Sequence, residues 1–344
     1  MRKLSLLVLV ALVAACGGSK STTTTTSSAG GGSKVLVGAG STFVYPLVSQ
    51  WIGDYSKSAG VTVTYGAIGS GGGIAAITDR TVDFGASDAP LTPDQLTKCK
   101  GCVEIPWALG GTSIAYNVKG APEHLKLTGP VLADIFLGKI TAWNDPAIAK
   151  LNPGSALPAT RIAPVFRSDG SGTSYNFTDY LSHVSPAWKA KVGTSTQPAF
   201  PAGQGAKGSS GVAGVLSHTD GAITYVDVAY ATTSNLSYAA IQNAANTFTL
   251  PDVATCKAAA AAAAAPKPNE GISIVDPPAS APDAYPICTF TYVIVPKQSP
   301  KAQTLRAFLT YAVTTGQQFG PKLLFAPLPS AVVAADKTAI ATIS

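Results

Sequence analysis

Three short segments rich in Gly, Ser and Thr each stand between a stretch expected to be a strand and a stretch expected to be a helix. They contain Ser41 and Thr42, then Ser70, then the run Ser171-Gly172-Thr173. The amino end of a helix presents unpaired N–H groups and positive partial charge, while glycine permits close approach and hydroxyls add donors. Any one of these loops is better explained as an ordinary helix cap. Three together, with Arg167 opening the third, predict an oxyanion site built mainly from neutral donors.

The pattern of apolar residues predicts the strands and helices that position these loops. Short runs of β-branched and aliphatic residues precede each loop, and apolar residues at helical spacing follow it. Strands are expected at 34–37, 61–65, 82–87, 161–166, 222–226 and 289–295, and helices at 43–55, 74–77, 130–137, 175–181 and 301–314. Alternation of this kind predicts an α/β fold with largely parallel sheets. The eight alanines at 258–265 are expected to form a surface excursion of low complexity.

Length and composition narrow the class of protein. A chain of 344 residues has room for two domains with real cores. Only 12% of the residues are charged, which excludes a disordered chain of high charge for most of the sequence. The 24 Lys and Arg residues outnumber the 18 Asp and Glu residues only slightly and form no run of five or more. This pattern argues against a nucleic-acid partner.

The amino-terminal segment indicates export. Met1-Arg2-Lys3 is positively charged, and residues 4–15 form an apolar run too short to span about 30 Å of hydrocarbon. Residues 1–15 are therefore predicted to be a signal peptide. The run ends Val13-Ala14-Ala15-Cys16, which resembles a bacterial lipobox and predicts a lipid on Cys16. An ordinary cleavage site that happens to precede a cysteine is the alternative. Residues 16–34 are expected to be a flexible tether. The protein is expected to be anchored by lipid to the outer face of the cytoplasmic membrane, or to lie in the periplasm.

Four further cysteines fit an exported protein. Cys99, Cys102, Cys256 and Cys288 are an even number, which predicts two disulfides with three possible pairings. The pairing most local in sequence is Cys99–Cys102 with Cys256–Cys288. The CxxC arrangement of Cys99 and Cys102 leaves open a redox dithiol or half of a metal site. None of the three histidines is spaced to complete such a site.

Motifs of common enzyme classes are missing from the sequence. Gly38 and Gly40 lack the third glycine of a dinucleotide fingerprint, because Phe43 stands at that position. No P-loop, zinc-protease motif, EF-hand loop or serine flanked by glycines at −2 and +2 occurs. Because no base stands beside a nucleophile, the chain is not expected to be an enzyme or to need a cofactor or metal.

Several segments together resemble one family. The sequence resembles the substrate-binding subunit of the bacterial high-affinity phosphate ABC importer, in order, from about Val35 to the carboxyl end. The segments that carry the likeness are GAGSTF at 38–43, IGSGG at 68–72, DFGASD at 83–88, DIFLGKIT at 134–141, RSDGSGTS at 167–174 and GAITYV at 221–226.

The resemblance implies a fold and partners. The family has a two-lobed periplasmic-binding-protein fold (venus-flytrap, type II) with a hinge between the lobes, and it clamps phosphate without performing chemistry. By this likeness, residues 35–117 and 289–344 form lobe one, and residues 118–288 form lobe two. The implied partners are inorganic phosphate, the permease subunits of an ABC transporter and, through the lipid anchor, the membrane. The protein is expected to be a monomer.

The resemblance also implies the site residues. The expected phosphate ligands are the Thr42 hydroxyl, the Phe43 N–H, Ser70, Asp88, Arg167, Ser171, the Gly172 N–H and Thr173. Asp169 matches the carboxylate that holds the arginine. Asp88 would accept the proton that phosphate keeps at neutral pH and would repel sulfate, which has none. Two alternatives stay open: a binding protein for another tetrahedral oxyanion such as sulfate or molybdate, and a secreted phosphoesterase.

Overall fold

The computed structural model describes residues 34–344, so the expected signal peptide, Cys16 and nearly all of the tether lie outside the described residues. The principal sheet has the strand order β2-β1-β3-β12-β4-β8-β6-β7, with β9 paired to β4, and a small sheet has the order β11-β10-β5. The strands are β1 (Val35–Gly40), β2 (Thr62–Ala67), β3 (Phe84–Ser87), β4 (Cys102–Asn117), β5 (Lys126–Leu127), β6 (Ala163–Arg167), β7 (Gln204–Ala206), β8 (Ala222–Asp227), β9 (Ser237–Tyr238), β10 (Ala240–Gln242), β11 (Phe248–Thr249) and β12 (Cys288–Pro296).

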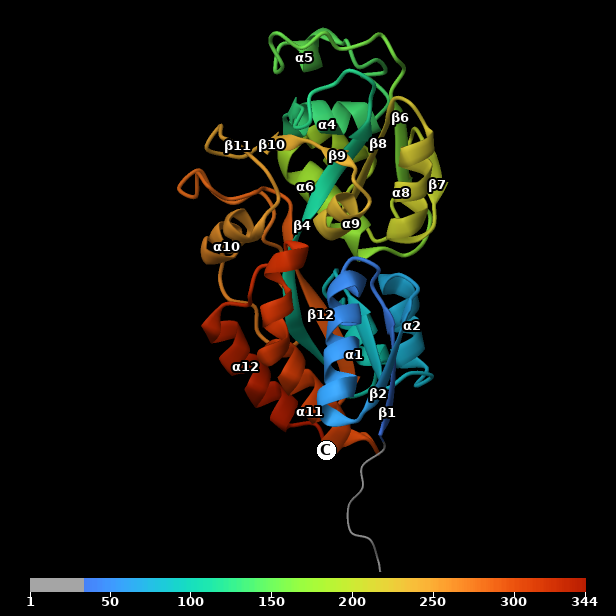
Figure 1. Ribbon diagram of the computed structural model, residues 1–344, viewed down its shortest axis with the longest axis vertical. Helices are drawn as coiled ribbons and strands as arrows, with labels where there is room; N and C mark the ends of the chain where they lie inside the picture. Colours follow the sequence, from blue (N-terminus) through green and yellow to red (C-terminus); the bar gives the residue numbers. More distant parts are fainter. Residues whose placement is uncertain (1–33) are drawn as a thin grey trace, which may run out of the picture. The chain divides into compact units, whose positions relative to one another are not determined.

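Strand β4 divides the principal sheet into two halves (Figure 1). Its first part, from Cys102 to Gly111, pairs antiparallel with β12, whereas its second part, from Thr112 to Asn117, pairs antiparallel with β8. The first half-sheet is thus β2-β1-β3-β12-β4, and the second is β4-β8-β6-β7. The sequence pattern did not reveal β4, because nearly every side chain along it is buried. A strand buried on both faces has no polar alternation to mark it.

Helices flank both half-sheets, and the five expected from the sequence overlap helices of the structure, whereas the others were not predicted. They are α1 (Tyr45–Ala59), α2 (Ser70–Thr78), α3 (Pro93–Lys98), α4 (Gly129–Phe136), α5 (Pro146–Ala149), α6 (Gly172–Val184), α7 (Pro186–Lys191), α8 (Gly208–His218), α9 (Val228–Thr233), α10 (Val253–Ala261), α11 (Ala302–Val313) and α12 (Ser330–Ala341). Helix α1 buries Leu47, Trp51 and Tyr55, which recur at a spacing of four. In the part of the chain that the structure describes, no helix is both long and apolar enough to cross a membrane.

The expectation of largely parallel sheets is half correct. Strand β1 is parallel to β2 and β3, and β6 is parallel to β7 and β8. Strands β12 and β4, at the centre, run antiparallel to their neighbours. Within each parallel group the loops at the carboxyl ends of the strands emerge at one edge of the sheet, which is where ligands bind in open α/β sheets.

The alanine tract departs from its expected role as a surface excursion. Its first residues complete α10, which ends at Ala261, and Ala259 and Ala260 are buried. The expectation was wrong for this part of residues 258–265. Alanine has the highest intrinsic helix propensity, and its small side chain permits close packing, so a run of alanines can extend a buried helix.

Two disulfides join the cysteine pairs that are closest in sequence, Cys99 to Cys102 and Cys256 to Cys288. The second pair links α10 to the start of β12, and the two residues are 32 positions apart. On the chain-entropy model, a cross-link of this span stabilises the fold by about 4 kcal/mol, against about 2 kcal/mol for the short Cys99–Cys102 loop.

We therefore expect the double variant Cys256→Ala/Cys288→Ala to lose about 2 kcal/mol more unfolding free energy than Cys99→Ala/Cys102→Ala. All four cysteines are buried, so the loss of sulfur packing is comparable in the two variants. Urea denaturation followed by circular dichroism measures both. Equal losses would contradict the loop-length argument.

Candidate functional site

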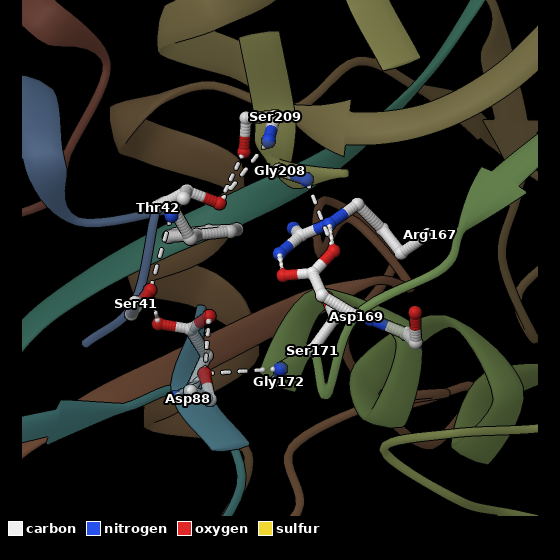
Figure 2. Close-up of polar contacts among 12 residues, drawn as sticks. Ser41, Thr42, Asp88, Arg167, Asp169, Ser171, Gly172, Gly208 and Ser209 are labelled. Carbon is white, nitrogen blue, oxygen red and sulfur yellow. Dashed lines mark hydrogen bonds and ion pairs between the residues drawn. The ribbon is translucent and has the colours of Figure 1, made fainter. Parts of the chain in front are cut away.

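The loops that follow β1, β3 and β6 meet where the two half-sheets adjoin (Figure 2). Ser41, Thr42 and Asp88 come from the first half-sheet, and Arg167, Asp169 and Gly172 face them from the second. Of the expected ligands, those assigned through a side chain are all buried: Thr42, Ser70, Asp88, Arg167, Ser171 and Thr173. The structure thus gathers residues far apart in sequence into one polar cluster.

Asp88 is surrounded by hydroxyl groups on the side of the first half-sheet. The Ser41 hydroxyl donates to Asp88 Oδ1 at 2.5 Å, and the Ser70 hydroxyl donates to Asp88 Oδ2 at 3.4 Å. Burial raises the pKa of Asp88 to about 6, although the hydrogen bonds from Ser41 and Ser70 and the charge of Arg167 oppose that rise. At neutral pH the carboxylate is therefore ionised and acts as a hydrogen-bond acceptor.

Asp169 holds Arg167 in a two-point contact on the side of the second half-sheet. Arg167 donates from Nε to Asp169 Oδ1 at 2.7 Å and from Nη2 to Oδ2 at 2.5 Å. The Gly208 N–H donates to the same Oδ1 at 3.0 Å. Burial would raise the pKa of Asp169, but the hydrogen bonds and charge of Arg167 outweigh it, and the pKa is lowered. The guanidinium is thereby fixed in one plane, with three of its five N–H groups left for other acceptors.

Hydrogen bonds connect the two half-sheets directly at this cluster. The Gly172 N–H donates to Ser70 Oγ at 3.0 Å, and the Gly71 N–H donates to the Gly170 carbonyl at 2.8 Å. A Cβ on Gly172 would lie 2.6 Å from the backbone nitrogen of Asp88, which is closer than real atoms approach. Glycine at this position is therefore required by the close contact between the two loops.

The other expected ligands lie in the same loops but differ in the hydrogen bonds that they already make. Ser171 caps α6 by accepting a hydrogen bond from the Ser174 N–H at 3.1 Å, so its own proton is left to donate. The Phe43 N–H donates to Ser41 Oγ at 3.0 Å. Thr173 Oγ1 is buried and has no hydrogen-bond partner within the described residues. A buried hydroxyl without a partner is costly, which marks Thr173 as available to a ligand.

The roles of Ser41 and of the pair Gly208 and Ser209 in the cluster were not predicted from the sequence. Ser41 stands beside Thr42 in the first loop, but its contact with Asp88 joins residues 47 positions apart. Gly208 and Ser209 open α8 and bond to Asp169 and Thr42. The signal for the second pair was present, because Gly208-Ser209-Ser210-Gly211 is a fourth Gly/Ser run close after a strand, and it forms the first turn of α8.

The chemistry of the cluster is that of anion binding. The Arg167 guanidinium and the hydroxyls of Ser171 and Thr173 keep donors for a ligand, and one ionised carboxylate supplies an acceptor. The N–H groups of Phe43 and Gly172 already donate to Ser41 and Ser70. Among residues 34–344, no group of three or more His, Cys, Asp or Glu side chains is arranged to hold a metal ion. The arrangement suits an anion that carries a proton of its own.

Comparison with known proteins agrees with this geometry. Residues 20–315 match the model of the PBP superfamily domain. The phosphate-binding protein PstS of Xylella fastidiosa (strain Temecula1) is 45% identical, and the match covers 86% of this chain and 82% of that protein. The PstS of Pasteurella multocida is 40% identical, with 88% of each chain covered. The chain belongs to the PstS family.

A solved structure of a phosphate-binding protein has the same fold as this chain. A phosphate-binding protein from Stenotrophomonas maltophilia, solved by X-ray crystallography, superposes with a TM-score of 0.67 over 88% of this chain and 93% of that one, at 21% identity. The fold is thus the two-lobed periplasmic-binding-protein fold that the resemblance implied.

Proposed function

We propose that this PstS-family chain binds inorganic phosphate between its two lobes and passes it to the permease of an ABC transporter. The observation that carries the proposal is the buried Asp88 carboxylate, which accepts hydrogen bonds from Ser41 and Ser70 and lies near enough to Arg167 for that charge to lower its pKa. Phosphate at neutral pH keeps at least one O–H, which can donate to Asp88 while its other oxygens accept from the donors. The names of the relatives support the same ligand.

The eight expected ligands and the lobe boundaries are part of this proposal. Residues 35–117 with 289–344, and residues 118–288, are the proposed lobes. The change of strand partner within β4 supports a crossing a few residues before the proposed boundary at 117. There Gly111 pairs with β12 and Thr112 pairs with β8. The Thr112 N–H also donates to the Ile287 carbonyl at 2.8 Å, just before β12. We infer that the hinge lies at these two crossings, where few residues connect the lobes.

The alternatives are less well supported. A sulfate or molybdate site would have no use for an acceptor carboxylate, because those anions are fully ionised at neutral pH. A phosphoesterase would need an activated nucleophile or a metal, and the relatives are named as binding proteins. We therefore propose a transport function and no catalysis.

Titration calorimetry of the purified mature protein tests the ligand. We expect saturable binding of phosphate with one site per chain, and no measurable heat with sulfate at the same concentration. Saturable binding of sulfate, with none of phosphate, would overturn the proposal.

We also propose that the mature protein is anchored by a lipid on Cys16, outside the described residues. The variant Cys16→Ser is expected to be released from the membrane or left unprocessed, because serine offers no thiol for the lipid. Ser19→Ala, in the same segment, is the matched control. Detergent partitioning and the mass of the amino terminus are measured, and the anchor is refuted when both are the same in Cys16→Ser as in the wild type.

A further inference from the structure

The hydroxyl of Thr42 is held from the opposite lobe by Ser209, a residue to which neither the sequence motifs nor the comparisons assign a role. Thr42 follows β1, and Ser209 is the second residue of α8. The two hydroxyl oxygens lie 2.8 Å apart, and the Ser209 N–H donates to Thr42 Oγ1 at 3.2 Å (Figure 2). Only 5% of Thr42 and 1% of Ser209 are exposed, so water does not compete for these contacts.

The direction of one hydrogen bond decides what Thr42 can do. A threonine hydroxyl has one proton and two acceptor lone pairs. The Ser209 N–H can only donate, so it occupies one lone pair of Thr42. If the Ser209 hydroxyl also donates, both lone pairs are filled and the Thr42 proton points elsewhere. If Thr42 donates to Ser209 instead, its proton is used and cannot reach an anion.

The surroundings of Ser209 favour donation from Ser209 to Thr42. The competing acceptor is Asp227, which caps α9 through Oδ1 and the Tyr230 N–H at 2.9 Å. A hydrogen bond from the Ser209 side chain lowers the pKa of Asp227, so this carboxyl competes for the Ser209 proton, yet its Oδ2 has no hydrogen-bond partner of good geometry among the described residues. Burial dominates, and together with the charge of Asp88 it raises the pKa of Asp227 to about 8. Thr42 Oγ1 lies 2.8 Å from Ser209 Oγ, and a bound anion that takes the Thr42 proton in a charge-assisted hydrogen bond leaves Ser209 as the only possible donor between the two hydroxyls.

The same turn of α8 also supports the other side of the site. The Gly208 N–H donates to Asp169, which holds Arg167, and the next N–H, that of Ser209, donates to Thr42. Consecutive N–H donors at the start of α8 therefore fix Thr42 directly and Arg167 through Asp169.

We propose that Ser209 is a positioning residue that fills both lone pairs of the Thr42 hydroxyl and turns its proton toward the bound anion. This inference rests on the proposed binding of phosphate. It predicts that Ser209 contributes to affinity only through the hydroxyl of Thr42.

A double-mutant cycle tests the inference by phosphate titration of the full mature protein. The variants are Ser209→Ala, Thr42→Val and the two combined, with Ser210→Ala, an exposed neighbour, as the matched control. We expect Ser209→Ala to weaken binding by about 5- to 20-fold, the effect of one buried hydrogen bond. In the Thr42→Val background the same change should cost less than about twofold, because there is no proton left to orient. Ser210→Ala should leave the dissociation constant unchanged.

A second background separates positioning from a structural role. Thr42→Ser keeps the hydroxyl, so Ser209→Ala should again cost about 5- to 20-fold there. A structural role for Ser209 would give the same cost in the Val and Ser backgrounds, and that result overturns the inference. An unchanged dissociation constant for Ser209→Ala overturns it as well. Wild-type protein that binds no phosphate would refute the proposed function itself, whereas wild-type binding with an additive cycle refutes only the role of Ser209.

Discussion

Replacing Arg167 by alanine is expected to weaken phosphate binding by about 2–4 kcal/mol, because a charge-assisted contact is lost in a closed cleft. Arg167 is 4% exposed, and Asp169 fixes its guanidinium in one plane. Its removal takes the only full positive charge from the cluster of expected ligands. It also leaves the carboxylate of Asp169 without its partner, which adds repulsion toward an anion.

Two further variants sharpen this prediction. Arg167→Lys keeps the charge but not the planar fork, so we expect a loss smaller than that of Arg167→Ala but still measurable. Arg161→Ala removes an exposed arginine from the same lobe and is expected to leave affinity unchanged. Titration calorimetry with phosphate measures all three. If Arg167→Ala binds as tightly as the wild type, Arg167 does not contact the ligand.

Asp88→Asn is expected to keep measurable phosphate binding but to lose at least about tenfold of the discrimination against sulfate. Like charges brought together in a buried site cost several kcal/mol, so an ionised Asp88 rejects an anion that has no proton to share. An amide in the same place removes that repulsion and can donate to sulfate. Phosphate loses one charge-assisted hydrogen bond and keeps its other contacts.

Competitive displacement of bound phosphate by sulfate measures this discrimination in both proteins. Asp94→Asn, a change to an exposed carboxylate that pairs with Lys98, is the control and should behave as the wild type. If sulfate competes equally poorly against wild type and Asp88→Asn, Asp88 is not the discriminating group.

The pH dependence of the competition follows from the raised pKa of Asp88. Because that pKa is about 6, the carboxylate is ionised above pH 6 and takes up a proton as the pH falls through this value. Sulfate should therefore compete better with decreasing pH against the wild type. Asp88→Asn has no such group, so its competition with sulfate should not follow the same transition.

Local sequence determined the units of this fold. The spacing of Leu47, Trp51 and Tyr55 predicts a helix, and the structure buries these residues on one face of α1. Ser171 was expected at a helix start, and it caps α6 through the Ser174 N–H. Periodicity and capping depend on residues within one or two turns, so one sequence suffices to recognise them. The loops that carry Thr42, Ser70 and Arg167 were found for the same reason.

Only the tertiary structure decided how these units meet. The antiparallel strands β12 and β4 lie between β3 and β8. The strand at 289–295 was expected, but its place at the centre of the sheet was not, and the uniform burial of β4 gave no periodic signal at all. The contact of Thr42 with Ser209 spans 167 positions, and the charge that opposes the burial-raised pKa of Asp88 comes from Arg167 in the other half-sheet. Such contacts depend on which strand ends become neighbours in the sheet. Strand order is set by the packing of the whole core, and no local stretch of sequence contains it.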